Sequence, residues 1–288
     1  MGRNATKQNQ PLPRADRARL AKETINKTIP GLLISNPRAQ IGVAGSQLLR
    51  DLPLISLPAT PRPTIRVIDS DSFDAAQSLR MSYPSGRVAV LSMASPLRPG
   101  GGILTGATSQ EESLCMRSTL LPSLRDEFYR LPENALIYTP DVLVFRGQDL
   151  SPLPKNDRFF VDVISCAALR FPEVEDGKYV VEADREVMMK KIRLILRAAV
   201  MKGCTRIVLG ALGCGAYANP AQEVAEMFKK VICGNPKRKG DETWGGTEEI
   251  VFAIRRGKDT IQAFRRVLQD VAVTDWNIVA GCNMPGAS

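Results

Sequence analysis

Apolar runs and amphipathic stretches alternate along most of the chain, from Thr64 to Val271. Short runs rich in β-branched and apolar residues predict buried strands. We expect strands at residues 64–68, 88–93, 135–139, 142–145, 159–165, 206–211 and 250–254. Stretches with apolar residues three and four positions apart predict helices. We expect helices at residues 71–82, 110–121, 124–131, 184–202, 220–232 and 259–271. This alternation predicts an α/β sandwich with a largely parallel or mixed sheet.

The first 63 residues do not follow this regular pattern. A modest apolar stripe predicts a helix at residues 16–28 that ends at Pro30. Residues 36–63 are rich in proline, which predicts an extended segment with one short helix near residues 45–50. We divide the chain into a disordered basic tail (1–14), a helical and loop extension packed on the domain (15–63), an α/β domain (64–275) and a C-terminal tail (276–288).

The composition limits the kinds of binding partner and the kinds of catalysis that we expect. Lys and Arg number 39 against 30 Asp and Glu, so the formal net charge is +9. Such a balance favours polyanionic partners, either nucleic acid or a phosphate-rich polymer. The chain contains 0 His, which excludes Ser-His-Asp and Cys-His catalysis and most zinc sites. Acid/base chemistry would therefore fall to carboxylates, Lys, Tyr or Cys.

The cysteines and the ends of the chain bear on the compartment. None of the 6 cysteines is spaced as Cys-x-x-Cys, and most lie in apolar segments. We interpret them as reduced core residues, because a disulfide framework or a metal site would show characteristic spacings. They are Cys115, Cys166, Cys204, Cys214, Cys233 and Cys282. With no secretory signal and no apolar run of membrane-spanning length, we expect an intracellular protein, cytoplasmic or nuclear, with no membrane contact.

A glycine-rich loop and two adjacent carboxylates follow the apolar strand at residues 88–93. Three consecutive glycines at residues 100–102 allow the backbone to approach a ligand and to point its N–H groups at it. Glu111 and Glu112 then begin a helix, where the dipole favours negative charge. A flexible loop and a solvated helix start would explain each part separately. Neither explains why both follow one buried strand at a short spacing.

A second glycine-rich loop, residues 210–219, follows the strand near residues 206–209 and precedes the helix that Pro220 begins. In open α/β folds, ligands bind beyond the carboxyl ends of the strands, and phosphates bind to loop and helix N–H groups. Gly213 and Gly215 are therefore candidates to cradle a diphosphate. The alternative is a plain strand-to-helix turn.

These motifs resemble the signature of the microbial (bacterial and fungal) poly(ADP-ribose) glycohydrolases. The resemblance comprises Gly100-Gly101-Gly102, a gap of seven residues and Gln110-Glu111-Glu112, with Ala94-Ser95 before them and Ser113-Leu114-Cys115 after them. It implies a macro-domain-like, three-layer α/β/α sandwich with a mixed sheet and an N-terminal helical extension. The implied activity is hydrolysis of the ribose–ribose O-glycosidic bond, exo-acting, with neither cofactor nor metal.

The resemblance also assigns roles to residues of this chain. Glu112 would be the general acid/base, and Glu111 would hold the ribose hydroxyls. Two carboxylates this close should raise the pKa of one of them, so that an acid is available near neutral pH. Tyr217 matches an aromatic residue that packs on the ligand, and Asn219 lies close enough to hydrogen-bond to it. The other substrate-binding residues that we expect are Gly100, Gly101, Gly102, Gln110, Gly213, Cys214, Gly215 and Ala216.

Adenine recognition is expected just after the strand at residues 64–68, where macro domains often place an acidic residue. Asp69 is our candidate, whereas Asp71 is better explained as a helix cap. Phe171 is a candidate stacking partner for the base. The chain departs from many microbial members at Ser92 and Arg98, where those members often have Asn. These two departures bear on substrate preference more than on the fold.

Other functions stay open at this point. Within the same fold, the chain could hydrolyse mono-ADP-ribose from protein or nucleic acid, or bind ADP-ribose without catalysis. An unrelated nucleotide-binding α/β enzyme is a further alternative, which the absence of a G-x-G-x-x-G or Walker loop disfavours. The expected partners are ADP-ribose or poly(ADP-ribose) on modified proteins, with nucleic acid as a second polyanion. We expect a monomer.

Overall fold

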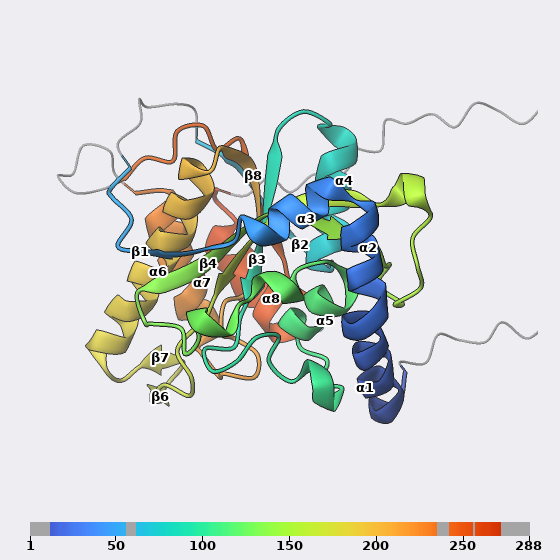
Figure 1. Cartoon of the computed structure of the whole chain (residues 1–288). Coiled ribbons are helices and arrows are strands. Elements are labelled where there is room, and N and C mark those ends of the chain that lie inside the picture. The colour runs from blue at the N-terminus through green and yellow to red at the C-terminus, as the bar shows by residue number, and fades with distance from the viewer. Residues whose placement is uncertain (1–11, 56–61, 235–241, 256, 272–288) are drawn as a thin grey trace, which may run out of the picture.

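The computed structural model describes residues 12–55, 62–234, 242–255 and 257–271, and these build a three-layer α/β/α sandwich (Figure 1). Its central sheet has seven strands in the order β1-β4-β5-β3-β8-β9-β2. They are β1 (Gln47–Arg50), β2 (Thr64–Ile68), β3 (Arg87–Met93), β4 (Ala135–Val144), β5 (Phe159–Cys166), β8 (Cys204–Leu209) and β9 (Glu249–Ala253). The five strands from β5 to β2 are parallel, and β1 and β4 pair antiparallel. The predicted mixed α/β sandwich is confirmed.

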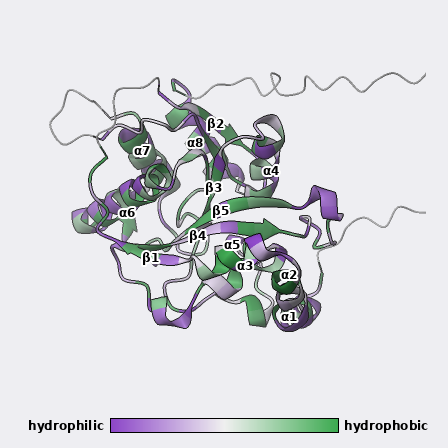
Figure 2. Ribbon diagram, turned by 45° about the horizontal axis from the view of Figure 1, so that its top comes forward, coloured by the Kyte–Doolittle hydropathy of each residue, from purple (hydrophilic) through white to green (hydrophobic). Residues whose placement is uncertain are grey.

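Helices cover both faces of this sheet. They are α1 (Arg14–Glu23), α2 (Ile29–Ser35), α3 (Pro37–Ala44), α4 (Ser72–Ser82), α5 (Gln110–Arg117), α6 (Glu182–Met201), α7 (Ala221–Ile232) and α8 (Lys258–Leu268). One hydrophobic core joins the sheet to α6, α7 and α8, and the other joins it to α1, α4 and α5. Side chains of β3 alternate between the two cores, so this strand is buried on both faces, and its ribbon is mostly hydrophobic in Figure 2. Burial on both faces explains its continuous apolar sequence.

Most elements from β2 to α8 match the prediction within a few residues. The cap of α4 is also confirmed, because the Asp71 carboxylate accepts the backbone N–H of Phe73 at 2.8 Å. Gly203 follows α6 with φ +70°, a left-handed conformation that glycine adopts readily after a helix.

The N-terminal prediction was wrong in two places. The helix does not end at Pro30, because α1 continues through a π-helical turn at Thr24–Thr28 into α2. Pro30 lies in the first turn of α2, where its missing N–H is tolerated. The short helix is α3 rather than residues 45–50, since Asn36 caps it by accepting the N–H of Ala39 at 3.2 Å.

Residues 47–50 instead form β1, which pairs with the start of β4. This strand precedes residue 64, at which we placed the start of the α/β domain, and the division of the chain into domains stays a prediction. The tail at residues 1–14 lies outside the described residues up to residue 11, and residues 272–288, with Cys282, lie outside them as well.

Two further predictions in the middle of the chain were wrong. Residues 124–131 hold a 3₁₀ turn at Asp126–Phe128 instead of a helix. The two strands expected at 135–139 and 142–145 are one strand, β4, with an irregularity between Thr139 and Val142. A small hairpin of β6 (Val174–Glu175) and β7 (Lys178–Tyr179) was missed, because two-residue strands leave almost no periodic signal.

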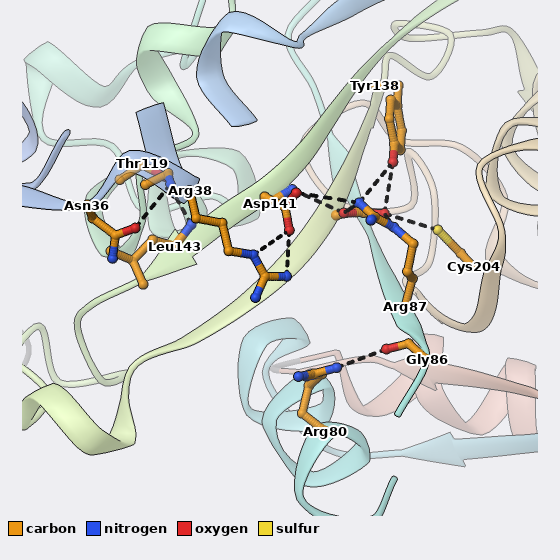
Figure 3. A network of polar contacts seen from close by, with 12 residues as sticks. Asn36, Arg38, Arg80, Gly86, Arg87, Thr119, Tyr138, Asp141, Leu143 and Cys204 are labelled. Atoms are coloured by element: carbon orange, nitrogen blue, oxygen red, sulfur yellow. Dashed lines mark hydrogen bonds and ion pairs between the residues drawn. The ribbon is translucent and has the colours of Figure 1, made fainter. Parts of the chain in front are cut away.

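An ionic network centred on the buried Asp162 holds the amino ends of the central strands together (Figure 3). The Asp162 carboxylate on β5 accepts two bonds from the Arg87 guanidinium on β3, at 2.7 and 2.6 Å. It also accepts the Tyr138 hydroxyl at 2.9 Å and the backbone N–H of Asp141 at 3.1 Å. This network lies at the opposite end of β3 and β5 from the two glycine-rich loops, so it stabilises the sheet without entering the site.

Candidate functional site

A cavity of about 1110 Å³ opens at the carboxyl ends of the parallel strands. Both glycine-rich loops and the start of α5 contribute to its walls. Loops after β2 and β9 close one side, and residues after β5 close the other. The lining includes Ser70, Asp71, Ser72, Ala94, Ser95, Gly101, Gly102, Gln110, Glu111, Glu112, Ala168, Arg170, Gly213, Cys214, Gly215, Ala216, Tyr217, Ile254 and Arg255. The position is the one that parallel α/β sheets use for ligands.

Gln110 fixes the start of α5 against the end of β3. Its side-chain oxygen accepts the backbone N–H of Met93 at 2.8 Å, and its amide donates to the carbonyl of Leu91 at 2.7 Å. The same amide donates to the Ser72 hydroxyl at 3.1 Å. Because protein atoms occupy both ends of this amide, we assign Gln110 to positioning the two carboxylates that follow it.

Each of those carboxylates has one anchored oxygen and one free oxygen. Glu111 Oε2 accepts the backbone N–H of Ser95 at 2.7 Å, and Glu112 Oε1 accepts that of Gly102 at 2.7 Å. The second oxygens, Glu111 Oε1 and Glu112 Oε2, are buried and have no hydrogen-bond partner among the described residues. Only 3% of Glu111 and 6% of Glu112 is exposed. Unpaired buried oxygens are costly and point to a ligand that satisfies them.

Burial changes the protonation of this pair. It raises the pKa of Glu111 to about 8, and the nearby charge of Glu112 adds to the rise. The backbone N–H groups of Ser95 and Gly100 act in the opposite direction. Glu111 is therefore largely protonated at neutral pH. A raised pKa within the pair was expected, and it falls on Glu111. The role of Glu112 as general acid/base stays a prediction.

The three glycines are required by contacts as well as by conformation. Gly100 and Gly101 have φ of +63° and +54°, in the left-handed region that glycine tolerates. A Cβ on Gly101 would lie 2.7 Å from Glu112 Oε1 and 3.0 Å from Glu111 Oε2. The backbone of this loop thus lies directly against both carboxylates. A generic flexible loop would not need such an approach.

Helix α1 supports the same loop from the other side. Arg14 Nε donates to the carbonyl of Thr105 at 2.8 Å, and Arg17 Nε donates to that of Gly106 at 2.8 Å. Gly106 has φ +71°, and its Cα faces the backbone of Arg14 so closely that a Cβ would clash. Leu12 and Arg17 also line the cavity. The sequence analysis missed this role of α1, for which the local sequence holds no signal.

The second glycine loop forms the opposite wall. Gly213 has φ +77°, and a Cβ there would lie 2.6 Å from that of Ala168, whereas a Cβ on Gly215 would meet no atom within 4 Å. The open space above Gly215 leaves its backbone accessible to a ligand. Burial raises the pKa of the Cys214 thiol to about 12, so this side chain is neutral at physiological pH.

Two expected ligand contacts lie elsewhere. Asn219 is buried behind the loop, where its amide donates to the carbonyls of Leu169 and Gly213 at 2.8 and 3.1 Å. Its oxygen accepts the Tyr179 hydroxyl at 2.8 Å, so Asn219 holds the loop and does not reach into the cavity. Asp69 is exposed and does not line the cavity.

Asp71 does line the cavity, but protein groups already occupy its carboxylate. Besides capping α4, it pairs with the Arg117 guanidinium at 2.5 Å. Neither Asp69 nor Asp71 therefore offers the cavity a free carboxylate for the edge of an adenine.

Several cationic groups surround the cavity. Arg98, Arg170 and Arg255 are exposed, line the cavity and form no ion pair with any described residue. Unpaired guanidinium groups beside a concave site suit phosphate oxygens, which they bind with two parallel hydrogen bonds. Of these three residues, only Arg98 could be singled out from the sequence. Arg170 and Arg255 follow β5 and β9, and only the sheet order brings them to one cavity.

Within the described part of the chain, no group of three or more Cys, Asp or Glu side chains is placed to hold a metal ion. Metal independence stays a prediction. No described helix has the length and hydrophobicity needed to cross a bilayer.

The fold and the site define a macro-domain-like protein, an α/β/α sandwich with a ligand cavity between two glycine-rich loops. Residues 39–147 match the catalytic domain of microbial-type poly(ADP-ribose) glycohydrolases. The matched segment carries the triple glycine and both carboxylates, the motifs in which the sequence resembles that family. No curated protein sequence matches the chain significantly.

Solved structures extend the similarity beyond the matched segment. A poly(ADP-ribose) glycohydrolase from Thermomonospora curvata is 29% identical and aligns with a TM-score of 0.73, covering 88% of this chain and 100% of its own. The same enzyme bound to the inhibitor ADP-HPD aligns with a TM-score of 0.70 at 29% identity, over 88% and 99% of the two chains. A poly(ADP-ribose) glycohydrolase from Deinococcus radiodurans in complex with ADP-ribose is 25% identical, with a TM-score of 0.66 and coverage of 82% and 99%.

Proposed function

We propose that this protein is a poly(ADP-ribose) glycohydrolase that cleaves ribose–ribose O-glycosidic bonds and releases ADP-ribose. The observation that carries the proposal is the pair Glu111 and Glu112, which line a cavity large enough for a nucleotide and each keep one oxygen without a hydrogen-bond partner among the described residues. A binding module would need neither carboxylate left unpaired. The relatives that bind ADP-ribose and ADP-HPD support the same substrate class.

The reaction needs a general acid and a group that holds the ribose in position. Cleavage builds oxocarbenium character at the anomeric carbon while its bond to the leaving oxygen breaks. Glu112 protonates that oxygen, then accepts a proton from the water that attacks the anomeric carbon. Glu111 holds a ribose hydroxyl through its free oxygen. Its raised pKa keeps a proton in the site, and a hydroxyl bridging the two carboxyl groups gives that proton a route to Glu112.

The remaining lining residues hold the diphosphate and the sugar. The backbone of Gly213, Gly215 and Ala216 forms one side of the diphosphate site, and the loop at residues 100–102 forms the other. Tyr217 packs on the ligand from above the second loop. Arg98 departs from the Asn that the family resemblance implies, and its guanidinium, which forms no ion pair with a described residue, contributes a phosphate contact.

The test compares substrates and variants. Wild type is given poly-ADP-ribosylated protein and, separately, the same protein carrying a single ADP-ribose, and released ADP-ribose is measured. Glu112→Ala should lose polymer cleavage and keep ADP-ribose binding. Glu226→Ala, an exposed acidic position on α7, is the matched control and should behave as wild type. Cleavage of only the singly modified protein would instead identify a mono-ADP-ribosyl hydrolase. Binding without any cleavage would identify a non-catalytic reader.

The cellular compartment of the enzyme is the second part of the proposal. We propose that it works inside the cell, in the cytoplasm or nucleus, since Cys115, Cys166, Cys204, Cys214 and Cys233 are all free thiols. The exo mode, the monomeric state and binding of nucleic acid by the basic surface stay predictions. Size-exclusion chromatography and competition of polymer cleavage by DNA or RNA test the last two.

A further inference from the structure

An exposed aromatic residue stands at the rim of the cavity. Phe171 is 64% exposed, and its ring lies 6.3 Å from that of Tyr217. The Arg170 guanidinium covers both rings, at 5.8 Å from Phe171 and 5.7 Å from Tyr217. Arg170 and Tyr217 line the cavity, whereas Phe171 lies just outside it. We call these three residues the rim platform.

The rim platform is held in place by specific contacts. Phe171 has φ +53°, an unfavourable conformation for an aromatic residue, and its N–H donates to the carbonyl of Tyr217 at 3.0 Å. Asn219 bridges the two segments by donating to the carbonyls of Leu169 and Tyr217, at 2.8 and 3.2 Å. In a hydrophobic core, burial of the Phe171 ring would offset the cost of this left-handed backbone conformation. Here the ring faces solvent instead, which suggests a ligand.

Sheet order places the rim platform relative to the chemistry. The loops after β9 and β2 close one end of the cavity, and β5, which leads to Arg170 and Phe171, lies on the other side of β3. The strand β3 leads to the carboxylates, which therefore lie between the two ends. Tyr217 lies near the carboxylates. Burial raises the pKa of the Tyr217 hydroxyl, and the charges of Glu111 and Glu112 add to this rise. Arg170 and a hydrogen bond with Ser95 lower the same pKa.

We propose that the rim platform is a subsite for the ADP-ribose unit next to the scissile bond, whose adenine stacks on Phe171 beside the Arg170 guanidinium. This inference rests on the proposed function. The terminal unit fills the cavity, and the chain leaves it past the carboxylates, toward the rim platform. Adenine is a flat π system that stacks on exposed aromatic rings and on guanidinium planes. A singly modified protein carries no second adenine to place there, so the subsite favours a polymer over a singly modified protein.

The experiment removes the ring and compares two readouts. Phe171→Ala should lower kcat/KM on poly(ADP-ribose) about tenfold, the loss expected for one stacked base. Its affinity for free ADP-ribose, measured by calorimetry, should stay within about twofold of wild type, because Phe171, unlike Tyr217, does not line the cavity that ADP-ribose fills. Phe171→Trp should keep polymer cleavage. Tyr83→Ala is the matched control, since Tyr83 also carries a stacked guanidinium, that of Arg206 at 3.8 Å, but does not line the cavity.

Each outcome of this experiment either supports or overturns the subsite. Unchanged polymer cleavage by Phe171→Ala would overturn the subsite. Equal losses in polymer cleavage and in ADP-ribose affinity would also overturn it, because Phe171 would then act on the terminal unit. An equal loss in Tyr83→Ala would reduce the effect to a general loss of stability. Failure of wild type to shorten the polymer would refute the proposed function itself, and the subsite with it.

Discussion

Single residues set the geometry of the two carboxylates. Glu111 and Glu112 each receive one backbone N–H, from Ser95 and from Gly102, and each keeps a second oxygen free. Gly101 lies so close to both that no side chain fits between them. At this scale the sequence was informative, because the spacing of the glycines and carboxylates is a local property. It gave no sign that the pKa of Glu111 would be raised, since that rise comes mainly from burial in the folded chain.

The first prediction concerns Gly101. Gly101→Ala should lower kcat on polymer at least about a hundredfold, because its Cβ would push the carboxylates out of place. The backbone strain alone should cost about 1–2 kcal/mol of unfolding free energy. Gly177→Ala is the control: its φ is +73°, and an added Cβ meets no atom within 4 Å. If both variants lose the same stability and only Gly101→Ala loses activity, the close approach is responsible. Full activity in Gly101→Ala would contradict it.

The second prediction follows from the pKa of Glu111, which burial raises from 4.5 to about 8. Between these pH values the folded protein keeps a proton that the unfolded chain has lost, so the free energy of unfolding falls as pH rises. Glu111→Gln removes this titration. The difference in Tm, variant minus wild type, should therefore become more positive from pH 5 to pH 8.5, measured by thermal unfolding. A difference that does not change with pH would show that Glu111 titrates normally.

At the scale of elements, α5 is fixed at both of its ends. Gln110 ties its first turn to β3, and the buried Arg117 ties its last turn to α4, through Asp71 at 2.5 Å and Asp74 at 2.8 Å. Elements with a strong period, such as α6 and β3, could be predicted from the sequence. Residues 47–50 could not, because β1 forms only through its pairing with β4, which no local pattern encodes.

The third prediction tests the fixation of α5. Arg117→Met should lower the free energy of unfolding by about 3 kcal/mol, since it removes the buried guanidinium that pairs with the mostly buried Asp71 carboxylate. Replacing Asp71 and Asp74 by Asn in the same chain should recover part of that loss. Urea denaturation of the single and triple variants provides the measurement. A single variant as stable as wild type would mean that the pair does not hold α5 in place.

On the scale of the whole molecule, structural and functional groups occupy opposite ends of the sheet. The Asp162 network joins the amino ends of β3 and β5 (Figure 3). The cavity opens beyond the carboxyl ends of the same strands. The sequence predicted the layered fold and both glycine loops. It did not predict that α1, Arg170 and Arg255 would meet at one cavity, because the order of the strands decides which loops are neighbours.

The fourth prediction tests this separation. Asp162→Asn should lower the free energy of unfolding by about 1–2 kcal/mol, because the partly exposed Arg87 guanidinium and the Tyr138 hydroxyl lose the buried, charged acceptor that they share. Below the unfolding transition, kcat and KM on polymer should stay at the wild-type values. A loss of kcat in the folded variant would show that the two ends of the sheet are coupled.

The central claim is that the carboxylate pair hydrolyses the glycosidic bond, and Glu112→Gln tests it most directly. This change keeps the shape of the side chain and its bond from Gly102, but removes the acid. The rate of ADP-ribose release from poly(ADP-ribose) should fall by at least about a hundredfold, with ADP-ribose affinity unchanged. A variant that still shortens the polymer at the wild-type rate would contradict the account, because the acid would then be another group.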